Sequence, residues 1–161
     1  GNNGTRKIAS LFSVRIQAAT SLQLNESRME TDSHADTSVV GKNALIIHDY
    51  NHPVCVTGYD PKYGTKEFRT ISAAVAYDHP QMGQVYMLVL NQAIEVPHLQ
   101  NNLLCPMQCR INGVKVNDFL KFLAEEPDQS THALQVIDFL DNESSLFIPL
   151  SLSGVTSYFL V

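Results

Sequence analysis

Residues 31–40 read Thr31-Asp32-Ser33-His34-Ala35-Asp36-Thr37-Ser38-Val39-Val40, and they decide how this 161-residue chain is interpreted. The segment starts polar and acidic and ends in two β-branched residues. Asp and Ser favour turns, because their side chains hydrogen-bond to nearby backbone groups, whereas valines favour strands. We therefore expect a tight turn that carries carboxyl groups and leads into a strand. An ordinary surface turn has the same composition, so this alternative stays open.

Short strand-like runs separated by turn signals lie on both sides of this segment. The predicted strands are Lys7–Gln17, Thr37–Val40, Ala44–His48, Val54–Tyr59, Phe68–Tyr77, Gln84–Val96, Ala133–Leu140, Leu146–Leu150 and Val155–Val161. Two short helices are predicted, within Asn101–Asn112 and Phe119–Glu126, and Pro106 suits a first helical turn. Many short strands with frequent turns indicate an all-β, barrel-like domain.

The predicted core is built from apolar residues of these strands. Its members are Leu45, Ile47, Val54, Ile71, Ala73, Val75, Val89, Ile94, Leu103 and Leu104.

Composition limits the possible classes of protein. Hydrophobic residues make up 44% of the chain and charged residues 17%, which is enough to form a core in one domain. The formal net charge of −5 and the lack of a Lys/Arg cluster argue against nucleic acid as a partner. No apolar run approaches the roughly 18 residues of a membrane span. Three cysteines, an odd number, predict no disulfide framework and favour an intracellular setting.

The turn resembles the catalytic turn of retroviral-type aspartic proteases. That turn runs Asp, Ser or Thr, Gly, Ala, often Asp, a hydroxyl residue and two apolar residues. This chain matches it at Asp32, Ser33, Ala35 and Asp36, and it departs from it at His34, which stands in the place of the glycine. Glycine lets a ligand approach the backbone closely, so His34 either points away from the cleft or narrows it.

A second block strengthens the resemblance. The segment 94–108 reads IEVPHLQNNLLCPMQ, and it is similar to a block of copia-type retrotransposon proteases. In that family a strand ends in Val-Pro, and Asn-Leu-Leu, a small residue and a short helix carrying Gln follow. The block crosses behind the catalytic turn and supports it. The two blocks occur here in the family's order, over roughly residues 28–116.

The resemblance implies a fold and a division of the chain. The expected fold is a retropepsin-like closed β-barrel with one short helix and extra C-terminal strands. Residues 1–27 would form an N-terminal strand and a polar loop, residues 28–125 the retropepsin-like core, and residues 126–161 a C-terminal β extension. The role of the extension is left open: residues 146–161 extend the sheet or join a dimer interface.

The resemblance also implies an activity, an aspartic endopeptidase that cuts a retroelement polyprotein. Asp32 would be the catalytic carboxylate, and Ser33 would brace the turn. The expected substrate-binding residues are His34, Ala35 and Asp36 in the turn and Tyr59, Asp60 and Gly64 in a hairpin flap. No cofactor and no metal are implied.

Partners follow from the count of catalytic turns. The chain holds one such turn, and a two-carboxylate site needs two, so a symmetric homodimer is expected. The substrate would be an extended peptide, with no nucleic-acid or membrane partner. The expected location is intracellular and cytoplasmic, and the resemblance also allows a location within virus-like particles.

Two other classes of function stay open. The first is a catalytically silent retropepsin-like module that dimerises or binds peptide, which His34 and the polar approach Met29-Glu30-Thr31 favour. The second is a zinc-binding domain. His48 and His52 are four residues apart, as are Cys105 and Cys109, and such pairs can bind zinc.

Overall fold

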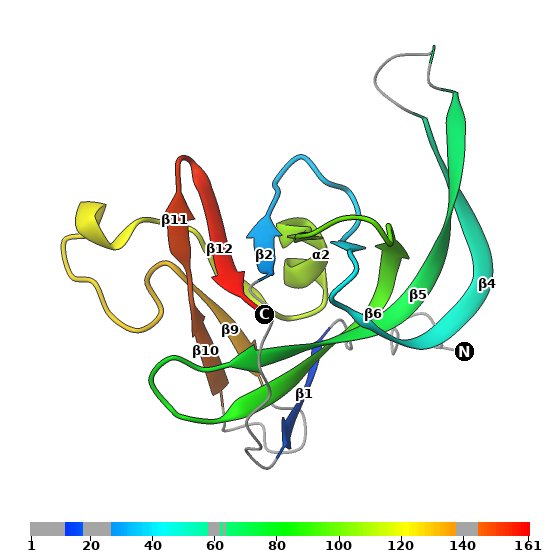
Figure 1. The fold of residues 1–161 in the computed structure, drawn as a ribbon. Coiled ribbons are helices and arrows are strands. Elements are labelled where there is room, and N and C mark those ends of the chain that lie inside the picture. Colours follow the sequence, from blue (N-terminus) through cyan, green and yellow to red (C-terminus); the bar gives the residue numbers. More distant parts are fainter. Residues whose placement is uncertain (1–11, 18–26, 58–61, 63, 138–144) are drawn as a thin grey trace, which may run out of the picture.

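The protein is described by a computed structural model that covers residues 12–17, 27–57, 62, 64–137 and 145–161 (Figure 1). Parts of three predicted segments fall outside these residues: the start of Lys7–Gln17, the end of Val54–Tyr59 and the end of Ala133–Leu140. Strands make up most of the described structure, as the all-β prediction required. No helix among the described residues is long and apolar enough to cross a membrane.

A nine-stranded mixed sheet forms the larger part of the molecule. Its order is β11 (Ser151–Ser153), β12 (Thr156–Leu160), β2 (Arg28–Thr31), β7 (Asn102–Leu104), β3 (Val39–Val40), β6 (Val85–Glu95), β5 (Thr65–Asp78) and β4 (Leu45–Thr57). β1 (Phe12–Gln17) pairs with β6 outside this path. Because β11 and β4 stand at opposite ends of the order, the described strands form an open sheet, and the prediction of a closed barrel is wrong.

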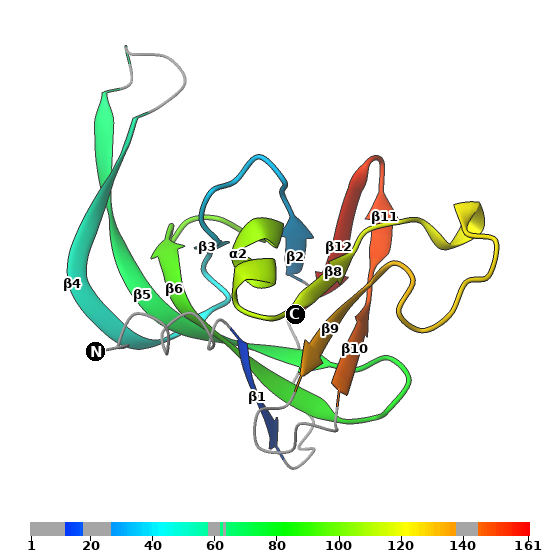
Figure 2. The same ribbon diagram turned by 180° about the vertical axis from the view of Figure 1, so that it is seen from behind.

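A smaller sheet lies beside the large one (Figure 2). It has the order β10 (Ser145–Pro149), β9 (Ala133–Ile137), β8 (Lys115–Asn117). The only α-helix that the described residues contain, α2 (Pro106–Ile111), starts with the proline, as predicted, and follows β7 and precedes β8 in the chain. The helix predicted over Phe119–Glu126 is wrong, since only a 3₁₀ turn, η2 (Lys121–Leu123), forms there. This segment is too short to be helical alone, and its apolar side chains are exposed rather than packed.

The strands β4 and β5 form a long curved arm at one end of the large sheet (Figure 1). The two strands predicted at Ala44–His48 and Val54–Tyr59 are joined in the single strand β4. The pairing of β4 with β5 shifts register between Asp49 and Pro53, where Asn51 has a φ of 53°. Such a bulge bends a strand and lets it continue past a proline.

One core joins both sheets. It is built from β2, β3, β5, β6, β7, β9, β10, β12 and α2, and it includes Leu134, Ile148 and Phe159 from the C-terminal strands. The core prediction is confirmed for the buried residues Ile71, Ala73, Val75, Ile94 and Leu104, whereas Val54, Val89 and Leu103 are half-buried. It is wrong for Leu45 and Ile47, because β4 is an edge strand that leaves them exposed.

Candidate functional site

The turn that carries Asp32 connects β2 to β3 through a set of short hydrogen bonds. The Asp32 N–H donates to the carbonyl of Leu104 in β7 (3.0 Å), and the N–H of Ala35 donates to the Asp32 carbonyl (3.2 Å). The His34 N–H donates to Asp32 Oδ1 (2.9 Å). Asp32 is half-buried, and Met29 in the preceding strand is fully buried. One carboxylate is therefore held in a fixed orientation at the end of a packed strand.

Helix α2 braces this turn from behind. The Gln108 side chain accepts a hydrogen bond from the Ser38 N–H (3.0 Å), and its amide donates to the Gln92 carbonyl in β6 (3.1 Å). The Cys105 N–H donates to Ser38 Oγ (3.0 Å), and the Cys105 thiol donates to the Ala35 carbonyl (3.0 Å). The hydroxyl that ties the turn to its support is thus Ser38, whereas the sequence analysis gave the bracing role to Ser33.

Contacts with Asn102 and Leu99 fix the position of the chain where it leaves the turn through β3. Asn102 Oδ1 accepts a hydrogen bond from the Gly41 N–H (2.8 Å), and Asn102 Nδ2 donates to the Arg28 carbonyl (3.3 Å). A Cβ atom at Gly41 would collide with the backbone carbonyl of Leu99. Glycine therefore allows the two chain segments to touch, and the buried amide joins the entry and exit of the turn.

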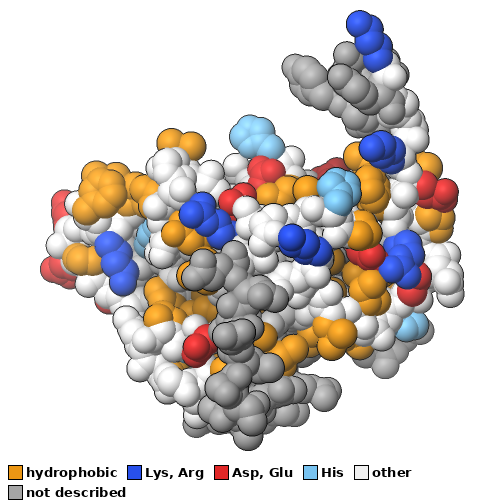
Figure 3. Space-filling view, viewed as in Figure 1, with side chains coloured by type: hydrophobic (Ala, Val, Ile, Leu, Met, Phe, Trp, Pro, Cys, Tyr) orange, Lys and Arg blue, Asp and Glu red, His pale blue; other side chains and the backbone are white. Residues whose placement is uncertain are grey.

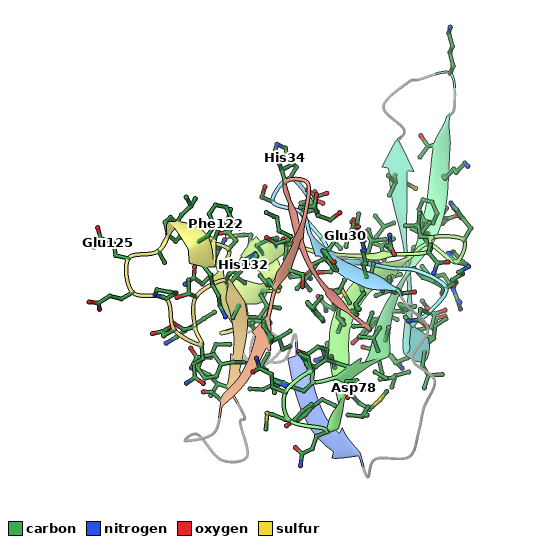
Figure 4. All side chains as sticks on the ribbon, turned by 60° about the vertical axis from the view of Figure 1, so that its left-hand side comes forward. Glu30, His34, Asp78, Phe122, Glu125 and His132 are labelled. Carbon is green, nitrogen blue, oxygen red and sulfur yellow. The ribbon has the colours of Figure 1, made fainter. Side chains whose placement is uncertain are left out.

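His34 lies at the outer end of the turn and is exposed (Figure 4). Its Nδ1 lies 3.4 Å from Ser33 Oγ. Figure 4 shows the His34 side chain directed away from the body of the molecule. In the single chain the His34 ring therefore faces solvent.

A groove of about 470 Å³ separates the turn from the β4–β5 arm. Asp36 and Thr37 line it from the turn, and Thr70 lines it from β5. The remaining lining residues are His52, Val54, Cys55, Val56, Gln92, Ile94 and Gln108. The Thr70 hydroxyl is buried and has no hydrogen-bond partner in the described structure. The groove thus offers polar groups from the turn and an apolar wall from β4.

A hollow of about 430 Å³ lies on the other side of the turn. Its residues are Thr31, Asp32, Ser33, Pro106, Asp118, Leu120, Leu152, Gly154, Val155, Thr156 and Ser157. The last five belong to the β11–β12 hairpin or its tip. The sequence analysis did not place this hairpin beside Asp32, since strand β11 was not predicted and β12 is over a hundred residues away in the chain.

The turn brings together five of the predicted site residues, Asp32, Ser33, His34, Ala35 and Asp36, although they face different spaces. Asp32 and Ser33 line the hollow, and Asp36 lines the groove. Gly64, with a φ of 69°, lies at the far end of the arm next to β5. Tyr59 and Asp60 lie outside the described residues.

A histidine–serine pair that the sequence analysis missed ties the hairpin to the rest of the chain. His132 Nε2 lies 2.9 Å from Ser157 Oγ, and both residues are buried. The Thr31 hydroxyl donates to the Ser157 carbonyl (3.2 Å), next to Asp32. Burial lowers the pKa of His132. No spacing in the sequence links positions 31, 132 and 157, so only the folded chain reveals this contact.

The two pairs considered as zinc ligands have different surroundings. His48 and His52 are exposed on β4. The Cys105 thiol bonds to the Ala35 carbonyl, and burial raises the pKa of Cys109 to about 12, which keeps that thiol protonated. Within the described residues, no group of three or more His, Cys, Asp or Glu side chains is placed to hold a metal ion.

Comparisons with known proteins add no relative. No protein-family model, no curated protein and no solved structure matches this chain.

Proposed function

We propose that this chain is one half of a homodimeric aspartic endopeptidase with a retropepsin-like fold. The observation that carries the proposal is the state of Asp32. Its backbone and one carboxylate oxygen are fixed by hydrogen bonds from opposite sides of the turn, while the residue remains partly accessible.

The proposed chemistry needs a second Asp32 from another copy of the chain. Two carboxyl groups within hydrogen-bond reach share one proton, because both cannot ionise at that distance. The ionised group removes a proton from a water molecule, which attacks the peptide carbonyl. The protonated group donates its proton to the carbonyl oxygen, which gives a tetrahedral intermediate with two hydroxyl groups. The carboxyl group that took the water proton then donates it to the departing nitrogen as the C–N bond breaks. The other carboxylate takes a proton back from one hydroxyl of the intermediate, so the pair again shares one proton.

The groove between the turn and the arm fits an extended peptide. Such a peptide can pair its backbone with an adjacent strand and place alternate side chains in pockets. Asp36, at the groove wall, is positioned to accept a backbone N–H, and the apolar side of β4 offers contacts for side chains. The resemblance of the two sequence blocks adds the expected substrate, a retroelement polyprotein, and a cytoplasmic setting.

The proposal is tested with Asp32→Asn in the purified chain, assayed on a peptide mixture at mildly acidic pH. The amide cannot act as acid or base, so the cleavage rate should fall by roughly 10²–10⁴-fold. The control is Asp128→Asn, because Asp128 caps its own loop through Ser130 and Thr131 and touches neither hollow nor groove. Cleavage that persists in Asp32→Asn would exclude an aspartic mechanism.

A catalytically silent, peptide-binding module is the second candidate. The observation that favours it is His34 at the tip of the turn, where a side chain stands in place of the family's glycine. His34→Gly separates the candidates. If the wild type binds peptide without cutting it and His34→Gly cuts it through Asp32, the module is a protease silenced by this one side chain.

A further inference from the structure

We propose that the second copy of the chain docks on an apolar face made by the β11–β12 hairpin and residues 119–123, across the hollow that holds Asp32. This inference rests on the proposed function, since it names the surface that would bring the two Asp32 carboxylates together. We call these residues the hairpin face.

The hairpin face is unusually apolar for an exposed surface. Val155, at the tip of the hairpin, is 98% exposed, and Phe122 in η2 is 76% exposed. Phe119 (54%) and Leu152 (41%) lie on the same two segments. Figure 3 shows hydrophobic side chains gathered over the tip of the β11–β12 hairpin and over the 3₁₀ turn. Leu120, Leu152 and Val155 line one hollow, so the two segments border the same space. Exposed apolar side chains grouped around one hollow are typical of an interaction site.

The hairpin is held firmly beside the catalytic turn. Strand β12 pairs with β2, with Tyr158 opposite Glu30 and Phe159 opposite Met29. The bonds from Thr31 and His132 to Ser157 add two further links. A rigid element that carries an exposed apolar tip loses little freedom on binding.

Symmetry identifies the occupant as a second copy. A two-fold axis that brings two Asp32 side chains together must pass close to Asp32, so the surface next to it meets its own equivalent. The hollow on that side combines the apolar side chains of Leu120, Leu152 and Val155 with hydroxyl residues and two carboxylates, those of Asp32 and Asp118. An interface with an apolar centre and a polar rim has this mixed composition.

The edge of the large sheet points to the same surface. Among the described strands, β11 ends the sheet and has a neighbour on one side only. All three of its residues are exposed. In an isologous dimer the two β11 edges run antiparallel and can continue the sheet across the axis.

The test compares Val155→Glu with Ile47→Glu by sedimentation over a range of concentrations. Ile47 is a matched control, because it is also an exposed apolar residue (53%) but lies on β4 at the opposite end of the sheet. Val155→Glu should weaken the dimer by roughly tenfold or more, and Ile47→Glu should leave it unchanged. Thermal melting of each variant checks that the fold is retained.

A distance measurement gives a second readout. Nitroxide labels at Val155→Cys, in a background with the exposed Cys55 changed to serine, should lie closer across the dimer than labels at Met82→Cys. Met82 lies in the β5–β6 turn, away from the hairpin face.

The outcomes separate this inference from the proposed function. A wild-type chain that stays monomeric, a dimer that survives Val155→Glu, or one that only Ile47→Glu dissociates overturns the hairpin face as the interface. If the dimer survives Val155→Glu, or if only Ile47→Glu dissociates it, the protease proposal still stands or falls with the cleavage assay on Asp32→Asn. A dimer that Val155→Glu dissociates, but that shows no Asp32-dependent cleavage, supports the interface and contradicts the protease.

Discussion

Gln108 is the side chain on which the geometry of the turn depends most. It accepts from the Ser38 N–H and donates to the Gln92 carbonyl, so it links helix α2 to the turn and to β6. Both of its partners are backbone groups, which must find hydrogen-bond partners when they are shielded from water.

Gln108→Ala should therefore lower the free energy of unfolding by about 1–3 kcal/mol, because it leaves the N–H of the buried Ser38 unsatisfied. Chemical denaturation of the variant measures the loss. Gln81→Ala, at an exposed glutamine in the β5–β6 turn, is the control and should be close to neutral. A Gln108→Ala variant as stable as the control would show that water replaces the side chain at no cost.

Sequence reasoning at this scale succeeded where a pattern was local. The turn at Asp32 and the helix starting at Pro106 follow from turn and capping preferences of neighbouring residues. Local preferences did not show which hydroxyl braces the turn, and the sequence pattern gave this role to Ser33. Ser33 and Ser38 are both hydroxyls in the same segment, and only the position of Cys105, 67 residues further on, shows that Ser38 is the one that α2 contacts.

The β4–β5 arm is the element whose shape matters most to the groove. Arg69 in β5 forms ion pairs with Asp49 in the β4 bulge and with Glu95 in β6. The N–H of Asn51 and the Arg69 guanidinium lower the pKa of Asp49, so this carboxylate stays charged at mildly acidic pH. The two ion pairs connect the bulge to the body of the sheet.

Arg69→Gln should loosen the base of the arm. We expect faster hydrogen exchange of the β4 amides around the bulge, with unchanged exchange in β9, which lies in the other sheet. Added salt should reproduce part of the effect in the wild type, since exposed ion pairs are screened. Equal exchange of these amides in the wild type and in Arg69→Gln would mean that the hydrogen bonds between β4 and β5 are enough to fix the arm.

Secondary structure was predicted correctly where the alternation of apolar residues was strong. It was predicted wrongly where tertiary packing determines the conformation or the burial of a residue. Strand β6 was expected over Gln84–Val96 and spans Val85–Glu95. The helix expected over 119–126 fails because its apolar residues face outward. Ile47 was expected in the core, but it lies on the edge strand β4 and is exposed.

At the scale of the whole molecule, His132 connects the two sheets and makes stability depend on pH. Desolvation lowers the pKa of His132 from its ordinary value of 6.5, with Asp118 raising it and Lys121 lowering it to smaller extents. The folded protein therefore resists the proton that the unfolded chain accepts. Above pH 6.5 both states hold a neutral ring; below it stability falls until the pH passes the folded-state pKa.

His132→Asn should make stability less sensitive to acid. Asparagine tolerates the positive φ of 51° at this position, and it does not titrate. The free energy of unfolding, measured from about pH 7 to about pH 5 around the ordinary histidine pKa, should decline less steeply in the variant. His98→Asn, at an exposed histidine, should keep the wild-type slope. Identical slopes in all three proteins would contradict the assignment.

The division of the chain at residue 125 was drawn from the length of the family's core, and the packing joins the two parts. Residues of β9, β10 and β12 complete the same core as β5 and β6. Pairings such as Met29 with Phe159 connect residues far apart in the sequence, and hydrophobic periodicity describes only the neighbours of a residue. A single sequence therefore predicted the strands at the C-terminus but not their partners.

The pairing of β2 with β12 also determines when this part of the sheet can fold during translation. A ribosome produces the Asp32 turn early, whereas the strand that covers the neighbouring edge of β2 is complete only once Leu160, the partner of Arg28, has been added. Until then the nascent chain carries an unfinished sheet beside its acidic residue. In the proposed protease, translation itself would postpone cutting until the last of these residues has emerged and folded back.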